Sequence, residues 1–254
     1  MSKVEQSKQL KIIGVIPARY ASTRFPGKPL ALLQGKPMIQ WVIETAKTSE
    51  ILSEIYVATD DQKIADVAKK VGARVAMTDP NCATGTDRIF QATEKMDFDV
   101  VINIQGDEPL IQKSNIDLLA KAFLENDKID MATLAHSLKE EDLLNKNAVK
   151  VIINKNSEAI YFSRFPIPFS RECCPQDQFP TSVQKHIGLY GYTKKFLKEF
   201  CMTLPADIEK FESLEQLRAL DLGAKIKVIS VEKPTYGVDT PEDLQKLEGM
   251  LAQK

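Results

Sequence analysis

A short loop near the N-terminus gathers three cationic side chains whose chemistry suits a polyphosphate. Arg19, Arg24 and Lys28 lie in residues 17–29, where Pro and Gly shape the backbone, and no Asp or Glu occurs from residue 6 to residue 43. Arginine offers a planar fork of donors and lysine a compact charge, so together they can neutralise several phosphate oxygens. A solvated basic loop is the ordinary alternative. We favour phosphate binding, because the backbone is pre-shaped and no acid close in sequence neutralises these cations.

The loop does not match the common nucleotide-binding fingerprints. Ser22 stands where a Walker A motif requires its first glycine, and Pro29 replaces the Ser or Thr that follows the lysine. The chain also lacks the sequence G-x-G-x-x-G, so a nicotinamide cofactor is unsupported. The charges instead suggest a nucleoside triphosphate that is held by side chains as well as by the backbone.

Two carboxylates are placed where a divalent cation would help phosphate chemistry. Asp107 follows an apolar run in Asn-Ile-Gln-Gly-Asp-Glu-Pro, and Asp239 lies in Gly-Val-Asp-Thr-Pro. Hard oxygen ligands of this kind suit Mg²⁺. Asp107 could instead cap a turn, whereas the helix start after Asp239 needs only Thr240 and Asp243 as capping residues. The spacing does not establish that Asp107 and Asp239 meet.

The second half of the chain adds polar side chains suited to a sugar. They are Arg164, His186, Tyr190, Glu215 and Gln216. Each also has an ordinary interpretation, as a surface cation, a structural histidine, a core tyrosine or a residue on a solvated helix face. Together they supply donors and acceptors that fit a polyhydroxylated, acidic sugar.

Alternating strand and helix patterns must position these groups. Strands are predicted at 12–16, 54–59, 74–77, 100–104, 148–153, 159–162, 186–192 and 226–231, and helices at 37–47, 64–71, from 84, 114–124, 193–200, 212–222 and from 240. The order in the first half predicts an α/β fold with a mainly parallel, doubly wound sheet, whose ligands bind beyond the carboxyl ends of the strands. We interpret residues 1–254 as one domain, with an antiparallel insertion at about 130–200 that mediates dimerisation.

Composition narrows the classes of function. The net charge of −1 gives no whole-protein case for binding nucleic acid or a membrane surface, and no apolar run approaches the length of a membrane span. The polar N-terminus lacks a signal-peptide pattern, so we expect a cytoplasmic protein. Cys82, Cys173, Cys174 and Cys201 show no C-x-x-C spacing, and only two histidines occur, which argues against a structural zinc site.

The ordered motifs together resemble the 3-deoxy-manno-octulosonate cytidylyltransferases, also called CMP-KDO synthetases. The resemblance runs from about residue 12 to residue 247. It rests on the blocks IPARYASTRFPGKPL, VATDD, TGTDRI, NIQGDEPL, NAVKV, AIYFSR, KHIGLYGY, LEQLRAL and GVDTPEDL. Departures from the family pattern are confined mostly to residues 173–181 and to the N-terminal extension.

The resemblance implies a nucleotide-diphospho-sugar transferase fold, a homodimer, and transfer of CMP from CTP to 3-deoxy-D-manno-octulosonate, with Mg²⁺ as cofactor, for lipopolysaccharide synthesis. It implies that Arg24 and Lys28 stabilise the departing pyrophosphate and that Asp107 and Asp239 are catalytic metal ligands. The implied CTP-binding residues are Pro17, Ala18, Arg19, Arg24, Lys28, Thr84, Gly85 and Arg88. The implied sugar-binding residues are Gln105, Arg164, His186, Tyr190, Glu215 and Gln216.

Two other kinds of function stay open at this point. A cytidylyltransferase of the same fold that activates sialic acid or the 8-amino octulosonate would keep the triphosphate and carboxylate contacts and change only the far end of the sugar site. A non-catalytic nucleotide-binding module could keep the basic loop without the metal acids. The presence of both Asp107 and Asp239 favours an enzyme.

Overall fold

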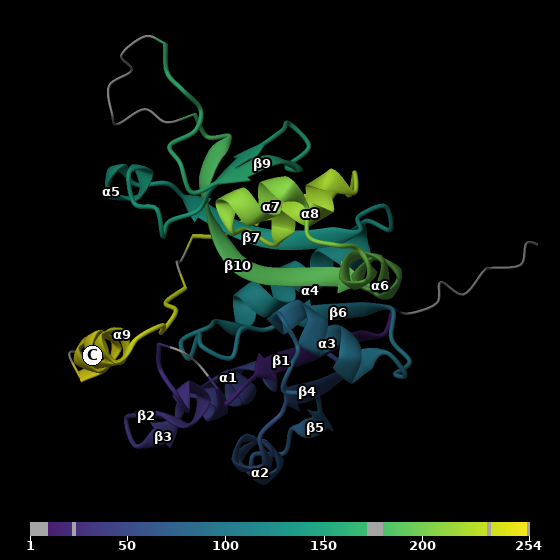
Figure 1. Ribbon diagram of the computed structural model, residues 1–254, viewed down its shortest axis with the longest axis vertical. Helices are drawn as coiled ribbons and strands as arrows, with labels where there is room; N and C mark the ends of the chain where they lie inside the picture. The colour runs from purple at the N-terminus through teal and green to yellow at the C-terminus, as the bar shows by residue number, and fades with distance from the viewer. Residues whose placement is uncertain (1–9, 22–23, 172–179, 233–234, 253–254) are drawn as a thin grey trace, which may run out of the picture.

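A nine-stranded sheet forms the centre of the computed structural model, which describes residues 10–21, 24–171, 180–232 and 235–252 (Figure 1). Seven strands follow the order β11-β7-β10-β6-β1-β4-β5, and β8 and β9 extend the sheet from β10. The strands of this sheet are β1 (Ile12–Ala18), β4 (Glu54–Thr59), β5 (Arg74–Met77), β6 (Val100–Asn103), β7 (Met131–Ser137), β8 (Lys150–Ile153), β9 (Ala159–Ser163), β10 (Val183–Thr193) and β11 (Ile226–Ser230). A separate two-stranded hairpin consists of β2 (Leu32–Leu33) and β3 (Lys36–Pro37).

Helices connect most of these strands. They are α1 (Met38–Ala46), α2 (Gln62–Lys70), α3 (Gly85–Thr93), α4 (Lys113–Glu125), α5 (Glu140–Leu143), α6 (Lys194–Met202), α7 (Asp207–Glu212), α8 (Gln216–Asp221), α9 (Pro241–Ala252) and the short 3₁₀ helix η1 (Lys28–Leu30). The pairs β1–β4, β1–β6, β4–β5 and β7–β11 are parallel, whereas β10 is antiparallel to its neighbours. The predicted α/β class with a mainly parallel, doubly wound sheet is therefore confirmed.

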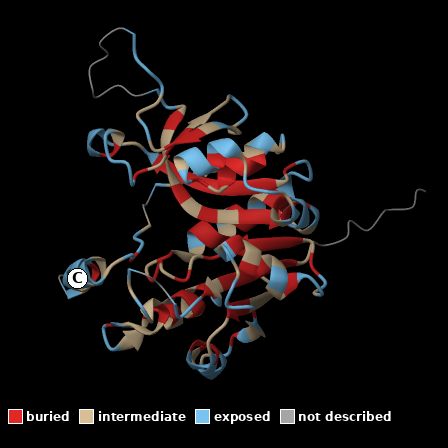
Figure 2. Ribbon diagram, in the orientation of Figure 1, coloured by how far each residue is buried: buried red, intermediate tan, exposed pale blue. Residues whose placement is uncertain are grey.

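Alternation along β1 explains why helices cover both faces of the sheet. Ile12 and Ile16 pack in one apolar cluster with α1, α2 and α4, while Ile13 and Val15 pack in another with α3, α6 and α8. Successive side chains of a strand point to opposite faces, so an unbroken apolar strand must be covered on both sides. Figure 2 shows the resulting concentration of buried residues in the central strands.

Several helix starts follow the capping signals in the sequence. The Asp61 carboxylate accepts hydrogen bonds from two amides at the start of α2. Thr84 and Asp87 form a capping box on α3, and the Thr193 hydroxyl accepts from the Phe196 amide at the start of α6. Such caps satisfy amides that the helix itself leaves without partners.

The helix predicted over 212–222 is shorter in the structure, where α8 covers Gln216–Asp221 of that range. It starts late because α7 ends at Glu212 and Ser213 adopts a left-handed conformation with φ of 52°. This conformation cannot continue an α-helix, although the apolar pattern runs across the break. The break places Glu215 at the N-cap of α8 rather than in the middle of a helix.

The segment at about 130–200 begins and ends in the main sheet. β7 and β10 pair with each other and lie among the central strands, and the chain between them carries α5 and the antiparallel pair β8–β9. The adjacent thiols at 173 and 174 lie outside the described residues. At the other end of the chain, α9 packs through Leu247 against an apolar cluster that includes Leu33 and Met38. None of the described helices is long and apolar enough to cross a lipid bilayer.

Candidate active site

The predicted nucleotide residues surround one cavity at the carboxyl end of β1. The cavity has a volume of about 290 Å³. Its lining includes all eight residues assigned to CTP, namely Pro17, Ala18, Arg19, Arg24, Lys28, Thr84, Gly85 and Arg88, together with Gln105, Asp107 and Asp239. The loops after parallel strands meet at one edge of a sheet, which is where such folds bind ligands.

The basic loop is closed on itself before it reaches Lys28. The Gly27 amide donates to the Tyr20 carbonyl at 2.9 Å, and Gly27 has a φ of 71°, a conformation that favours glycine. Pro29 follows at the first turn of η1, where its missing amide costs nothing. This closure turns the Lys28 side chain, which is only 14% exposed, toward the cavity.

Gly106 lets the loop after β6 approach β1 closely. A Cβ atom at this position would lie 2.9 Å from the Pro17 carbonyl oxygen, so any larger residue would push the two loops apart. The next residue, Asp107, therefore reaches the cavity beside the basic loop.

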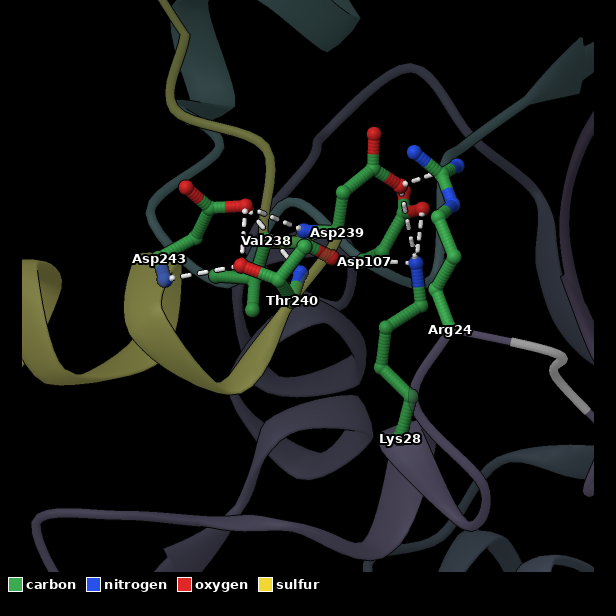
Figure 3. Close-up of polar contacts among 7 residues, drawn as sticks. All are labelled: Arg24, Lys28, Asp107, Val238, Asp239, Thr240 and Asp243. Atoms are coloured by element: carbon green, nitrogen blue, oxygen red, sulfur yellow. Dashed lines mark hydrogen bonds and ion pairs between the residues drawn. The ribbon is translucent and has the colours of Figure 1, made fainter.

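Asp239 is brought to Asp107 by the backbone of the C-terminal segment (Figure 3). The Val238 amide donates to the Asp107 carbonyl at 2.9 Å. The helix start beyond it is capped by Asp243, whose carboxylate accepts from the Asp239 and Thr240 amides at 3.1 and 3.0 Å. The cap thus uses the Asp243 and Thr240 side chains and leaves the Asp239 carboxylate turned toward the cavity.

The two predicted metal ligands share one ammonium group. Lys28 Nζ lies 2.7 Å from Asp107 Oδ2, 3.5 Å from Asp239 Oδ1 and 3.0 Å from the Val238 carbonyl oxygen, and Arg24 Nη2 lies 3.1 Å from the same Asp239 oxygen (Figure 3). Asp107 and Asp239 therefore do converge. The expectation that the loop cations lack acid partners is wrong for Lys28 and Arg24, because their partners come from distant parts of the chain.

The start of α3 forms another wall of the cavity. Thr84 and Gly85 lie at its N-terminus, and Arg88 follows one turn later. The Arg88 guanidinium is buried, lies 3.1 Å from Asp60 Oδ2 and donates to Thr78 Oγ1 at 2.5 Å. Asp60 thus compensates the Arg88 charge inside the protein, and the position of Arg88 in the cavity wall depends on this ion pair.

Three of the predicted sugar residues, Arg164, His186 and Glu215, lie near a fourth, Tyr190, next to the nucleotide cavity. The charges of Glu215 and Arg164 act on the pKa of Tyr190, which burial raises strongly, and the Tyr190 and His186 ring centres are 5.4 Å apart. Thr84 Oγ1 donates to Glu215 Oε1 at 3.2 Å, so the sugar cluster adjoins the α3 wall. Gln105 Nε2 donates to Asn103 Oδ1, opposite Tyr190 in the pairing of β6 and β10.

The protonation of His186 can be derived from its neighbours. Thr133 Oγ1 lies 2.9 Å from His186 Nε2 and also 3.1 and 2.9 Å from the carbonyl oxygens of Ile187 and Leu189. The hydroxyl has one proton, which those carbonyls require, so its oxygen accepts the Nε2 proton and Nδ1 is left as an acceptor. Burial lowers the pKa of His186 to about 3, which keeps the imidazole neutral.

Two acidic side chains near the sugar cluster have unusual environments. Burial raises the pKa of Glu215, while hydrogen bonds from Thr86 and Thr84 oppose the shift. Burial and then the charge of Asp107 raise the pKa of Glu108 to about 8, and its Oε2 has no hydrogen-bond partner among the described residues. Gln216 Nε2 is a buried donor that likewise lacks a partner in the described part of the chain.

Sequence reasoning missed Asp60, Cys82, Ala83 and Glu108. Cys82 and Ala83 line the cavity, and Asp60 holds Arg88. Glu108 lies inside a motif that the sequence did single out, but nothing in the pattern showed that its side chain is buried. For Asp60, the adjacent Asp61 gave the stronger local signal as a helix cap.

Comparison with known proteins identifies the family of the chain. The family described as cytidylyltransferase matches residues 13–226. A protein of Bdellovibrio bacteriovorus named 3-deoxy-manno-octulosonate cytidylyltransferase is 55% identical over 245 residues, which cover 96% of this chain and 99% of that protein. A mitochondrial protein of Arabidopsis thaliana with the same name is 43% identical and is matched over 96% of this chain and 84% of its own.

A solved structure extends the agreement to three dimensions. CMP:2-keto-3-deoxy-manno-octonic acid synthetase in complex with CTP superposes with a TM-score of 0.89 at 37% identity, covering 96% of this chain and 99% of that one. The nucleotide-diphospho-sugar transferase fold expected from the sequence is thereby confirmed. Motifs, fold and full-length similarity lead to one conclusion: the chain belongs to the 3-deoxy-manno-octulosonate cytidylyltransferase family.

Proposed function

We propose that this protein transfers CMP from CTP to the anomeric hydroxyl of 3-deoxy-D-manno-octulosonate and releases pyrophosphate. The observation that carries the proposal is the convergence of Asp107 and Asp239 on Lys28, at the edge of a cavity lined by every residue assigned to CTP. The names of the relatives and the CTP complex of the solved neighbour supply the substrates. In the reaction, the sugar oxygen forms a bond to the α-phosphorus as the bond to the pyrophosphate oxygen breaks.

The cations of the basic loop would hold the triphosphate and stabilise the leaving group. Arg24 is 67% exposed and can turn toward phosphate, while Lys28 is fixed between the two carboxylates. Phosphoryl transfer depends mainly on positioning and on electrostatic stabilisation, both of which these residues supply. No side chain needs to form a covalent intermediate.

Asp107 and Asp239 fit a divalent cation. An ammonium group already lies within hydrogen-bonding distance of both carboxylates, so the pair forms a site for positive charge. Two carboxylates are enough for Mg²⁺, since this ion uses one or two carboxylates and takes its other ligands from water and phosphate. Bound there, Mg²⁺ would offset phosphate charge and lower the pKa of the attacking hydroxyl.

The cluster around Tyr190 would hold the sugar acid. Arg164 offers a cation for the carboxylate, and neutral His186 offers Nδ1 as an acceptor for a hydroxyl. The Gln216 amide nitrogen, a buried donor without a partner among the described residues, gains one if a sugar oxygen binds beside it.

We further propose that the enzyme acts as a cytoplasmic homodimer and that its product serves lipopolysaccharide assembly. Dimerisation is supported by the large apolar side chains exposed beside β9 and on α7, where Phe165 is 73% and Phe211 92% exposed.

The direct test is pyrophosphate release from CTP and Mg²⁺ with three sugars: 3-deoxy-D-manno-octulosonate, its 8-amino analogue and sialic acid. Release with the first sugar is the expected result. A preference for either other sugar would keep the mechanism and change the substrate. If folded protein that binds CTP releases no pyrophosphate with any sugar, the chain is a binding module rather than an enzyme.

A further inference from the structure

A lysine outside the nucleotide cavity is completely buried and bonded only to carbonyl groups. Lys150, the first residue of β8, has no exposed surface. Its ammonium donates to the carbonyl oxygens of Arg164 at 2.6 Å, Ala148 at 2.8 Å and Asn145 at 3.2 Å. An ammonium group has three donors, so these three bonds use its full capacity.

The three carbonyls come from two segments that meet at the sugar cluster. Two belong to the turn at 145–148, and the third belongs to Arg164, which directly follows β9. Lys150 lies opposite Ser163 in the β8–β9 pairing, so its side chain connects the turn to the end of β9. The same turn supplies the Lys146 carbonyl that accepts from Arg164 Nη1 at 3.0 Å.

The Arg164 guanidinium is held from three sides. Besides the bond to Lys146, Nε donates to the Glu212 carbonyl at 2.9 Å and Nη2 to the Ser213 carbonyl at 3.2 Å. A guanidinium has five N–H groups, so one proton on each terminal nitrogen makes none of these bonds to the described residues and can serve a ligand. Two adjacent donors with fixed geometry match a carboxylate.

If the Lys150 side chain only filled space, the desolvation of its charge would lower the stability of the fold without a compensating benefit. Burial lowers the pKa of Lys150, and the charge of Glu212 opposes that shift. An apolar side chain of similar length would fill the same volume without the cost of desolvating an ammonium group. What an apolar chain would lose is the fixed position of the turn and of the Arg164 backbone.

We propose that Lys150 is a positioning residue for the sugar acid: it joins the 145–148 turn to Arg164 and so keeps the two remaining Arg164 donors directed at the sugar carboxylate. The inference rests on the proposed function, because it takes Arg164 as the carboxylate partner. Lys150 itself touches neither substrate.

The first test compares Lys150→Met with Lys194→Met. Lys194 is half-buried, donates to the Met96 carbonyl and lies over the Phe98 ring, so it serves as a control for losing an ammonium–carbonyl bond whose partners are outside the sugar cluster. For Lys150→Met we expect the KM for the sugar acid to rise about ten- to hundredfold, the effect of a misplaced charge-assisted hydrogen bond, with the KM for CTP within about twofold of wild type. Lys194→Met should lower the Tm without changing either KM. An equal change in both substrates for Lys150→Met, or a Tm change alone, would overturn the proposal.

The second test asks whether Lys150 acts through Arg164. In a double-mutant cycle, Lys150→Met should add less than about threefold to the sugar KM once Arg164→Met is present. A full additional effect would show that Lys150 acts by another route. Lys150→Gln keeps some donor capacity in a smaller side chain, so its sugar KM should fall between wild type and Lys150→Met, and it replaces the methionine variant if that protein does not fold.

A third measurement does not depend on activity. In protein labelled with ¹⁵N-arginine, the Arg164 Nε–H signal, assigned by its loss in Arg164→Lys, should exchange slowly with solvent in wild type and at least tenfold faster in Lys150→Gln. Unchanged exchange would refute the positioning role even in a protein that turns over no substrate. Inactive wild-type protein with the expected change in exchange would instead refute the proposed function and leave the role of Lys150 in holding Arg164 supported.

Discussion

Replacing Asp107 by Asn should separate the stability of the fold from its chemistry. The Asp107 carboxylate lies 2.7 Å from Lys28 Nζ and is one third exposed, with the lysine 14% exposed. Partly exposed ion pairs of this kind contribute about 1 kcal/mol, because solvent screens the charges. The variant should therefore lose about 2–4 °C in Tm, the shift that about 1 kcal/mol produces in a domain of this size.

The expected effect on turnover is much larger. Asn has nearly the same shape as Asp but carries no charge. It therefore lacks the negative charge that would bind Mg²⁺ and that, together with Asp239, faces the Lys28 ammonium. A metal ligand at the transferring phosphate contributes several kcal/mol to transition-state stabilisation, so kcat should fall by about 10³-fold or more. The assay is pyrophosphate release at saturating CTP, sugar and Mg²⁺, with thermal unfolding measured on the same samples.

Asp142→Asn provides the control for the loss of an ion pair outside the site. It removes a carboxylate that also lies 2.7 Å from a lysine, Lys185, but the pair is outside the cavity and only 6% of the Asp142 side chain is exposed. A larger loss of Tm than for Asp107→Asn is therefore expected, with turnover within about twofold of wild type. If Asp107→Asn also keeps turnover within a few-fold of wild type at saturating Mg²⁺, the assignment of Asp107 as a metal ligand is refuted.

Three further outcomes are expected. Gly106→Ala should raise the KM for CTP about tenfold and lower stability by about 1–3 kcal/mol, because its Cβ would press on the Pro17 carbonyl; steady-state kinetics and urea unfolding measure both effects. Arg88→Met should lower the unfolding free energy by about 3–5 kcal/mol by leaving buried Asp60 unpaired, and adding Asp60→Asn should restore part of the loss; full additivity of the two changes would contradict this pairing. Between pH 6.5 and about 3, His186 binds a proton more readily in the unfolded state than in the folded state, so the unfolding free energy should fall as the pH falls through that window, by up to about 1.4 kcal/mol per pH unit. In denaturant titrations, the unfolding free energy of His186→Gln should depend less steeply on pH than that of wild type. Identical slopes would contradict a depressed pKa of His186.

The alternation of strands and helices could be predicted from sequence, and so could the residues that line the nucleotide cavity. The sequence signals for both act between residues that are close together in the chain. An unbroken apolar run such as Ile12–Ile16 specifies a strand covered on both faces, and Thr84 and Asp87 specify a helix start within four residues. The placement of Lys28 follows in the same way from the Gly27 turn that precedes it. These features arise from physical preferences that act over a few residues.

The parts that could not be predicted depend on contacts between distant residues. The partner of Arg88 is Asp60, whose neighbour Asp61 gave the local helix-cap signal, and the late start of α8 within the helix predicted over 212–222 rests on the left-handed backbone of Ser213. The Ser213 carbonyl also accepts a hydrogen bond from Arg164 Nη2. The unfavourable left-handed backbone of Ser213 therefore makes a hydrogen bond with a residue far away in the sequence. Local propensity cannot report such a compensation.

The charged residues of the site show what the lack of nearby acids in the sequence could predict. It led us to predict a loop that binds phosphate, but it did not predict the ion pairs that the loop cations form in the fold. Lys28 and Arg24 have no acid neighbours in sequence, yet the fold brings Asp107 and Asp239 to them from two other loops. Each charge in this group is thus half of an ion pair. Under the proposed function each has a second role, the cations toward phosphate and the carboxylates toward Mg²⁺. Pairing offsets the desolvation cost of the four side chains, and under the proposed function the phosphates and Mg²⁺ would take the place of these partners without a rearrangement of the loops.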